Sequence, residues 1–183
     1  PLTADHGGCP LTEVSLIRGT DAGSIAADLL GKDAETFLNQ TFGAGRPTDK
    51  WLESVASPWV YLNQRLIKER GLQQAKVEAA LAGWLKEQTG IQTVYTRSQL
   101  TQPMPESDEL GRSVQKSFFA PRSGDLMVVI KPSYLLTSVF LTGTNHGTPH
   151  GYDTHGPLLI SGPGVRTGVR KDAVTPQATA AIL

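Results

Sequence analysis

The clearest pattern of apolar and polar positions lies in the middle of the chain. Between residues 73 and 88, apolar residues recur at spacings of three, four, seven and eight positions, and Gly90 follows them. This spacing predicts an amphipathic helix that ends before the glycine. Trp84 lies on the apolar stripe of this helix, where a large aromatic residue normally packs in the core. We therefore expect Trp84 to be structural.

Shorter patterns predict further helices and strands on both sides of this helix. Ile25 to Phe42 forms a loose apolar stripe interrupted by Gly31, so one helix over about 24–41 and two shorter ones are both open. Residues 51–61 contain Pro58, which suits an edge strand with an irregularity. The remaining expected elements are a short helix over 62–70, strands at 91–96 and 125–130, a helix over 106–118 and a short apolar run at 158–160.

Helices and strands therefore alternate through the middle of the chain, which predicts an α/β fold. Residues 1–8 resemble the end of a strand that runs into a glycine turn, and residues 174–183 resemble a helix that stops after about two turns. We interpret the chain as a segment of a longer protein, incomplete at both ends. An export signal, if the intact protein has one, is not available to inspect.

Composition and charge exclude several classes of protein. The 183 residues include 17 basic and 17 acidic side chains, so the net charge recruits neither nucleic acid nor an anionic membrane. A 39% share of hydrophobic residues is enough to form a core. The sequence has no apolar run of about 20 residues, the length needed for a membrane-spanning helix. The single Cys9 cannot form an intrachain disulfide, and we expect it to be a small buried residue.

Candidate chemistry is concentrated in one segment. Three of the four histidines lie between residues 146 and 155, among glycine, threonine and aspartate, and the fourth, His6, follows Asp5. Such a segment is costly to order, because glycine loses much backbone freedom on folding. Imidazole and carboxylate groups are ligands that suit zinc. A metal site and a solvated loop both remain open from composition alone, since no fixed zinc-binding spacing is present.

Two blocks of sequence resemble a known family. Thr3-Ala4-Asp5-His6-Gly7 is similar to the Asp-His-Gly strand end of the alkaline phosphatase superfamily, in particular its type I phosphodiesterase/nucleotide pyrophosphatase branch and the bacterial alkaline phosphatases close to it. The segments 146–149, 152–155, 157–159 and 162–165 resemble the late metal-binding region of that family in order and spacing, and residues 122–132 resemble the segment before it.

The resemblance implies a fold and a domain organisation. The expected fold is α/β, part of an alkaline-phosphatase-like three-layer sandwich with a mixed sheet flanked by helices. Residues 1–183 would form the C-terminal portion of one such domain, incomplete at both ends. Residues 24–120 would be an insertion or a cap-like α/β segment within it.

The resemblance also implies site residues and a cofactor. Asp5 and His6 would ligate one zinc of a two-zinc centre, and His146 would ligate the other. His150, Asp153 and His155 would lie around the ligands or on the surface. The nucleophile, a Thr or Ser, would lie upstream, so no catalytic residue is expected in this chain. Catalytic zinc normally has three protein ligands, so the segment alone is expected to bind metal weakly and to be inactive.

The intact protein would then be a metal-dependent hydrolase of small phosphate esters, of alkaline phosphatase or phosphodiesterase type. By resemblance it would be periplasmic or extracellular, with no membrane span and no nucleic acid polymer as a partner. The alternatives are a sulfatase or phosphomutase-like member of the same superfamily, and a non-catalytic binding or structural fragment. Gly156 occupies a position where the family usually has Val, which weakens the start of the following strand.

Overall fold

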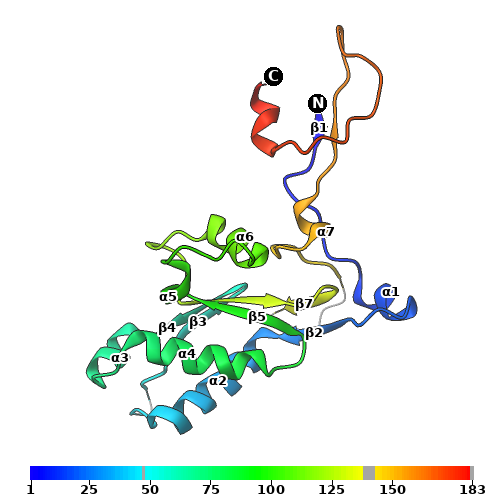
Figure 1. Cartoon of the computed structure of the whole chain (residues 1–183). Coiled ribbons are helices and arrows are strands. Elements are labelled where there is room, and N and C mark those ends of the chain that lie inside the picture. The colour runs from blue at the N-terminus through cyan, green and yellow to red at the C-terminus, as the bar shows by residue number, and fades with distance from the viewer. Residues whose placement is uncertain (47, 138–142, 182–183) are drawn as a thin grey trace.

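The chain forms an α/β body from which its two terminal segments extend together (Figure 1). A computed structural model describes residues 1–46, 48–137 and 143–181. The body contains a four-stranded sheet with the strand order β3-β4-β6-β5, and a two-stranded sheet formed by β2 and β7. The terminal segments are joined by a third, two-stranded sheet of β1 and β8. The expected α/β class is therefore confirmed.

Strand β6 (Leu126–Ile130) lies inside the four-stranded sheet, where all five of its residues are buried. It runs antiparallel to β5 (Ile91–Thr96) and to β4 (Trp59–Leu62). Successive side chains of a strand point to opposite faces of its sheet. Val128 packs in the larger core cluster and Val129 in the smaller one, so both faces of β6 meet apolar side chains. Burial on both faces explains why this strand reads as a continuous apolar run.

Helices cover both faces of this sheet. Helices α2 (Ala27–Phe42) and α4 (Gln74–Lys86) contribute to the larger cluster, while α5 (Arg97–Leu100) and α6 (Glu109–Ser117) contribute to the smaller one. The helix predicted over 73–88 is confirmed as α4. Trp84 packs against the core as expected, with its ring centroid 5.5 Å from that of Phe37. The predicted strands at 91–96 and 125–130 and the helices at 62–70 and 106–118 are also present, the latter two as α3 (Gln64–Glu69) and α6.

Two expectations for the first third of the chain need correction. A single helix forms across Gly31, as one of the two alternatives has it, but residues 24–26 belong to β2 (Gly23–Ala26), which pairs in parallel with β7 (Tyr134–Thr137), so the helix starts only at Ala27. Residues 51–61 form a hairpin of β3 (Leu52–Ala56) and β4 instead of one irregular edge strand. The turn lies at Ser57 and Pro58, which are joined by a cis peptide bond. Both features depend on pairing with neighbouring strands, which the local pattern does not reveal.

The terminal segments form little regular structure. Strand β1 (Leu2–Thr3) pairs antiparallel with β8 (Leu158–Leu159), and α7 (Gly151–Thr154) lies next to this sheet. The expected C-terminal helix is a 3-10 helix, η1 (Pro176–Ala181), and the last two residues of that expectation lie outside the described part. A short helix that the pattern did not predict, α1 (Thr12–Ile17), follows Cys9. In the described part of the chain, no helix combines the length and the apolar character needed to cross a membrane.

Candidate metal site

The two blocks of sequence that carry the candidate ligands lie side by side. The backbone N–H of Gly7 donates to the carbonyl oxygen of Asp153 at 2.8 Å, and the N–H of Cys9 donates to that of Asn145 at 2.9 Å. The hydroxyl of Thr144 donates in turn to the carbonyl oxygen of Cys9. Figure 1 shows the N-terminal segment, in blue, running past α7, in orange. The fold thus joins the beginning of the chain to a segment about 140 residues later.

The rings of His6 and His146 stack on each other at this junction. Their centroids are 3.6 Å apart, with an angle of 20° between the ring planes. Asp5 lies beside His6, with its Oδ1 3.7 Å from Nε2 of His6 and 3.1 Å from the backbone N of His6. The structure therefore places His6 in contact with both of the other sequence-predicted ligand residues. Side chains of Asp5 and His6 are 89% and 39% exposed, so their polar atoms are accessible to an ion or substrate.

Hydrogen bonding leaves one nitrogen of His6 available as a ligand. The Nδ1 atom lies 2.6 Å from the carbonyl oxygen of Gly7, and a ring N–H that donates there places the lone pair on Nε2. Metal-binding histidines commonly donate their second ring N–H to a carbonyl in this way, which fixes the tautomer and the orientation of the ring. In this tautomer, His6 could bind an ion through Nε2.

Asp5, His6 and His146 do not form a closed metal site by themselves. Within the ranges that the structure describes, no three His, Cys, Asp or Glu side chains are grouped so as to hold a metal ion. Catalytic zinc sites normally have three protein ligands and an open position. The three residues are consistent with part of a donor set, and residues beyond this group would have to complete it.

The other two histidines of the late segment lie differently. His150 is half-buried, and its Nε2 lies 2.8 Å from the carbonyl oxygen of Ile130 at the end of β6. This bond ties the loop to the four-stranded sheet. His155 is exposed just after α7, where its Nδ1 lies against Gly151. Neither imidazole is part of the stack of His6 and His146.

Asp153 and Cys9 are buried beside the candidate ligands. Asp153 is 4% exposed, and its Oδ2 accepts hydrogen bonds from the backbone N–H and the hydroxyl of Thr148, at 2.7 and 2.5 Å. Burial raises the pKa of the Cys9 thiol, and the negative charge of Asp153 adds to this effect. Cys9 thus remains a neutral thiol at physiological pH, as expected of a packing residue. A cavity beside His146 is lined by Cys9, Ile130, Leu136 and Asn145, among others.

The glycine at position 156 has a structural explanation. A Cβ atom added there would lie 3.1 Å from the carbonyl oxygen of Ala4, on the segment that carries β1. That distance is tighter than an ordinary van der Waals contact, so a side chain would require the two segments to shift apart. Gly156 therefore permits the close approach of the terminal segments.

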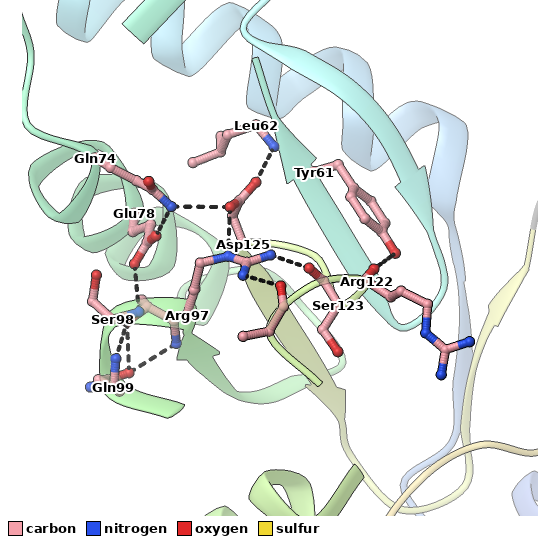
Figure 2. A network of polar contacts seen from close by, with 12 residues as sticks. Tyr61, Leu62, Gln74, Glu78, Arg97, Ser98, Gln99, Arg122, Ser123 and Asp125 are labelled. Atoms are coloured by element: carbon pink, nitrogen blue, oxygen red, sulfur yellow. Dashed lines mark hydrogen bonds and ion pairs between the residues drawn. The ribbon is translucent and has the colours of Figure 1, made fainter. Parts of the chain in front are cut away.

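A second cluster of polar residues lies inside the body, and sequence reasoning missed it (Figure 2). Asp125 is 5% exposed and accepts hydrogen bonds from the N–H of Leu62 at 2.7 Å and from Nε2 of Gln74 at 3.1 Å. It also pairs with Nε of Arg97 at 3.0 Å. Glu78, which is fully buried, accepts from Nε2 of Gln74 and from the N–H of Ser98. Because these carboxylates are hydrogen-bonded within the fold, we assign the cluster a structural role.

No family model matches the chain. It spans about 30% of the length of the curated relatives that it matches. It is 31% identical over 179 residues to alkaline phosphatase PhoD of Zymomonas mobilis, covering 88% of this chain and 29% of that protein. It is 26% identical over 168 residues to a protein of Myroides odoratus named a calcium-transporting ATPase, covering 91% of this chain and 30% of that protein.

A solved structure agrees with the phosphatase match. The crystal structure of wild-type alkaline phosphatase PafA matches this fold with a TM-score of 0.74 at 25% identity, over 91% of this chain and 30% of that one. The likeness includes the α/β arrangement with mixed sheets and helices. The sequence and fold comparisons together support placing this chain in the alkaline phosphatase superfamily.

Proposed function

We propose that this chain is part of a metal-dependent hydrolase of phosphoric esters, in which Asp5 and His6 bind one zinc ion of a two-zinc centre and His146 binds the other. The observation that carries the proposal is the stacking of His6 on His146, with centroids 3.6 Å apart. These two imidazoles come from segments about 140 residues apart in the sequence, and His6 also lies beside the carboxylate of Asp5. The similarity to alkaline phosphatases supports the same reading.

The side chains of Asp5, His6 and His146 are of the types that bind zinc. Imidazole nitrogen and carboxylate oxygen are zinc ligands, and the hydrogen bond from His6 to Gly7 leaves Nε2 available. Two bound zinc ions supply an activated nucleophile and positive charge for the phosphoryl oxygens. Asp5, His6 and His146 would orient the ions through their fixed positions on the two joined segments. Residues of the full-length protein outside this chain would supply the other ligands and a Thr or Ser nucleophile.

The finer parts of the proposal follow from the family resemblance. The substrate would be a small phosphate ester, and the enzyme would be of alkaline phosphatase or of phosphodiesterase/nucleotide pyrophosphatase type. Residues 24–120 would form an insertion or cap-like segment. The full-length protein would act in the periplasm or outside the cell. The present chain alone would be inactive, because it offers only part of the donor set.

The test uses the full-length protein and two single variants, His6→Ala and His146→Ala. Bound zinc is measured by elemental analysis, and rates are measured with p-nitrophenyl phosphate and bis(p-nitrophenyl) phosphate. Each variant should lose zinc and more than about 100-fold in rate, because even residues that only support a ligand typically cost 10- to 100-fold. His155→Ala is the control, since His155 is exposed beyond α7.

Full zinc content and an unchanged rate in His146→Ala would contradict the assignment of this residue. If the wild-type protein binds no zinc and hydrolyses neither ester, the proposed function is wrong, and hydrolysis of p-nitrophenyl sulfate then distinguishes a sulfatase from the remaining alternatives. The ratio of the two wild-type rates decides between monoesters and diesters as the preferred substrate class.

A further inference from the structure

Asp153 lies where the two ligand-bearing segments meet. Its side-chain Oδ2 accepts the backbone N–H of Thr148 at 2.7 Å and the hydroxyl of the same residue at 2.5 Å. Its main-chain carbonyl oxygen accepts the N–H of Gly7 at 2.8 Å. One residue is therefore hydrogen-bonded to both segments.

Both contacts are close in sequence to a candidate ligand. Gly7 directly follows His6, and Thr148 is two positions after His146. The two chain segments also approach each other closely, because a Cβ atom on Gly7 would lie only 1.8 Å from the carbonyl oxygen of Tyr152. A shift of α7 would thus be transmitted to one imidazole through Gly7 and to the other through Thr148.

The carboxylate of Asp153 is in an environment that stability alone does not explain. The residue is 4% exposed, and removing a charged group from water is costly unless it is hydrogen-bonded. Thr148 satisfies Oδ2 with two donors, whereas Oδ1 is buried without a hydrogen-bond partner among the described residues. An unpaired buried oxygen reduces stability, so an apolar residue could pack there at lower cost. What the carboxylate provides is a fixed connection to Thr148.

We infer that Asp153 is a positioning residue: by holding Thr148 with its side chain and Gly7 with its backbone, it sets the relative placement of the His6 and His146 imidazoles. Its effect on zinc binding rests on the proposed function. The geometric part does not, because it concerns only the hydrogen bonds and the ring positions of this chain's own residues.

The neighbouring His150 holds the loop in a different direction. Its Nε2 is bonded to the carbonyl oxygen of Ile130, which ties the loop to β6 and not to the segment of His6. Several contacts join the two candidate ligand segments: the N–H of Gly7 donates to the carbonyl oxygen of Asp153, Cys9 bonds to the backbone of Asn145 and to the hydroxyl of Thr144, and β1 pairs with β8. The Asp153 carboxylate adds Thr148 to this connection, and a substitution of Asp153 removes that contact.

The test compares full-length wild-type protein with Asp153→Ala, Thr148→Val and Thr148→Ser. Asp153→Ala removes the oxygen that accepts both bonds from Thr148, whereas the amide oxygen of an asparagine could still accept them. Zinc affinity is measured by competition with a chromophoric chelator. The ring proton signals of His6 and His146 are recorded by NMR on metal-free protein. Asp153→Ala should weaken zinc binding by about 10- to 100-fold, the usual cost of losing a residue that orients a ligand. Thr148→Val should weaken it less, and Thr148→Ser, which keeps the hydroxyl, should restore it.

The ring signals test the geometric role directly. Stacked rings shift each other's proton resonances, so these shifts should shrink in Asp153→Ala and be retained in Thr148→Ser. Asp33→Ala is the matched control, since Asp33 is an exposed carboxylate on α2, remote from the site. It should reproduce the wild-type zinc affinity and ring signals.

A folded Asp153→Ala variant with zinc affinity within about twofold of wild type and unchanged ring signals would overturn the inference. If Asp153→Ala does not fold, the comparison of Thr148→Val with Thr148→Ser decides, and equal behaviour of these two variants overturns it. If the wild-type protein binds no zinc, the proposed function fails. The ring signals of metal-free protein still decide the geometric role in that case.

Discussion

Arg97 and Asp125 are bonded to each other twice. The guanidinium Nε of Arg97 pairs with Oδ1 of Asp125 at 3.0 Å, and the backbone N–H of Arg97 donates to the carbonyl oxygen of Asp125 at 2.7 Å. Arg97 begins α5 directly after β5, and Asp125 directly precedes β6. The pair therefore fixes the start of β6 against the end of β5 (Figure 2).

Removing the carboxylate of this pair should destabilise the fold. Asp125→Ala leaves Arg97 without its carboxylate partner and the N–H of Leu62 without its acceptor, and breaking a buried pair typically costs about 3 kcal/mol or more. Urea unfolding of the full-length protein measures the loss. Asp125→Asn keeps the shape and removes the charge, so it should fall between Asp125→Ala and wild type.

Glu69→Gln is the control for this prediction. It removes an ion pair between Glu69 and Arg65, whose side chains are 47% and 57% exposed. Solvent screens such pairs, so the unfolding midpoint should not change measurably. A midpoint for Asp125→Ala equal to that of Glu69→Gln would show that the buried pair does not stabilise the fold.

Two adjacent glycines should respond differently to the same substitution. In Gly7→Ala the added methyl group would lie 1.8 Å from the carbonyl oxygen of Tyr152, so the segment must move away from α7. In Gly8→Ala the nearest atom, the hydroxyl oxygen of Thr144, is 3.5 Å away, an ordinary contact. Overpacking typically costs about 1–3 kcal/mol.

We expect Gly7→Ala to lower the melting temperature and, under the proposed function, to reduce bound zinc, because Gly7 directly follows His6. Gly8→Ala should match wild type in both measurements, by differential scanning calorimetry and elemental analysis. Equal melting temperatures for the two variants would show that the segment around Gly7 lies farther from α7 than it does in this structure.

Alanine substitutions at Gly90 and Gly71 distinguish the cost of backbone strain from the cost of a steric clash. Both have positive φ, +83° and +64°, so alanine at either position carries a strain of about 1 kcal/mol. Only at Gly90 would the added Cβ also meet the ring of Tyr134, at 2.4 Å. That ring is buried, and its hydroxyl donates to Asp21 at 2.8 Å, so it cannot move aside cheaply.

Gly90→Ala should therefore destabilise the protein by about 3 kcal/mol, and Gly71→Ala by about 1 kcal/mol. Chemical denaturation of both variants gives the difference, which reports the packing contribution of Tyr134. If the two losses are equal, the ring yields to the new methyl group and the junction of β5 with β7 is not tightly packed.

The sequence predicts those helices and strands that are determined by the apolar pattern of their own residues. The helix over 73–88 follows from its apolar spacing, and the strand at 125–130 follows from its continuous apolar run. Strand β2 was mistaken for the start of a helix because its main stabilising contact is β7, more than 100 residues away in the sequence. The hairpin of β3 and β4 was missed for a similar reason, since pairing with β6 is not visible in the sequence of 51–61.

In the functional and polar clusters, too, local motifs were predictable from the sequence and long-range contacts were not. Motifs that resemble a family identify Asp5, His6 and His146, and the structure places His6 against each of the other two. The role of Asp125 could not be anticipated, because its partners Leu62, Gln74 and Arg97 lie on separate elements. A buried network of this kind is specified by tertiary packing, and its members look like ordinary surface residues in the sequence.

Tyr95 should make the stability of the protein fall at alkaline pH. Burial raises the pKa of its hydroxyl well above the usual 10.0, and the hydrogen bond that it donates to Oδ1 of Asp108 at 2.8 Å adds to the effect, as does the charge of that carboxylate. In the unfolded chain Tyr95 ionises near its usual pKa, while in the folded protein it keeps its proton. Above about pH 10 the folded state thus binds more protons than the unfolded state, and the free energy of unfolding decreases as pH rises.

Urea unfolding at intervals from pH 8 to 11 checks this dependence. Tyr95→Phe removes the ionising group, so its stability should fall less steeply above about pH 10 than that of wild type. Asp108→Asn keeps an oxygen that can accept the N–H of Gly111 at the start of α6 and removes only the charge, so its slope should lie between the other two. A Tyr95→Phe slope equal to that of wild type would mean that the hydroxyl of Tyr95 titrates alike in the folded and unfolded states, which its burial against Asp108 argues against.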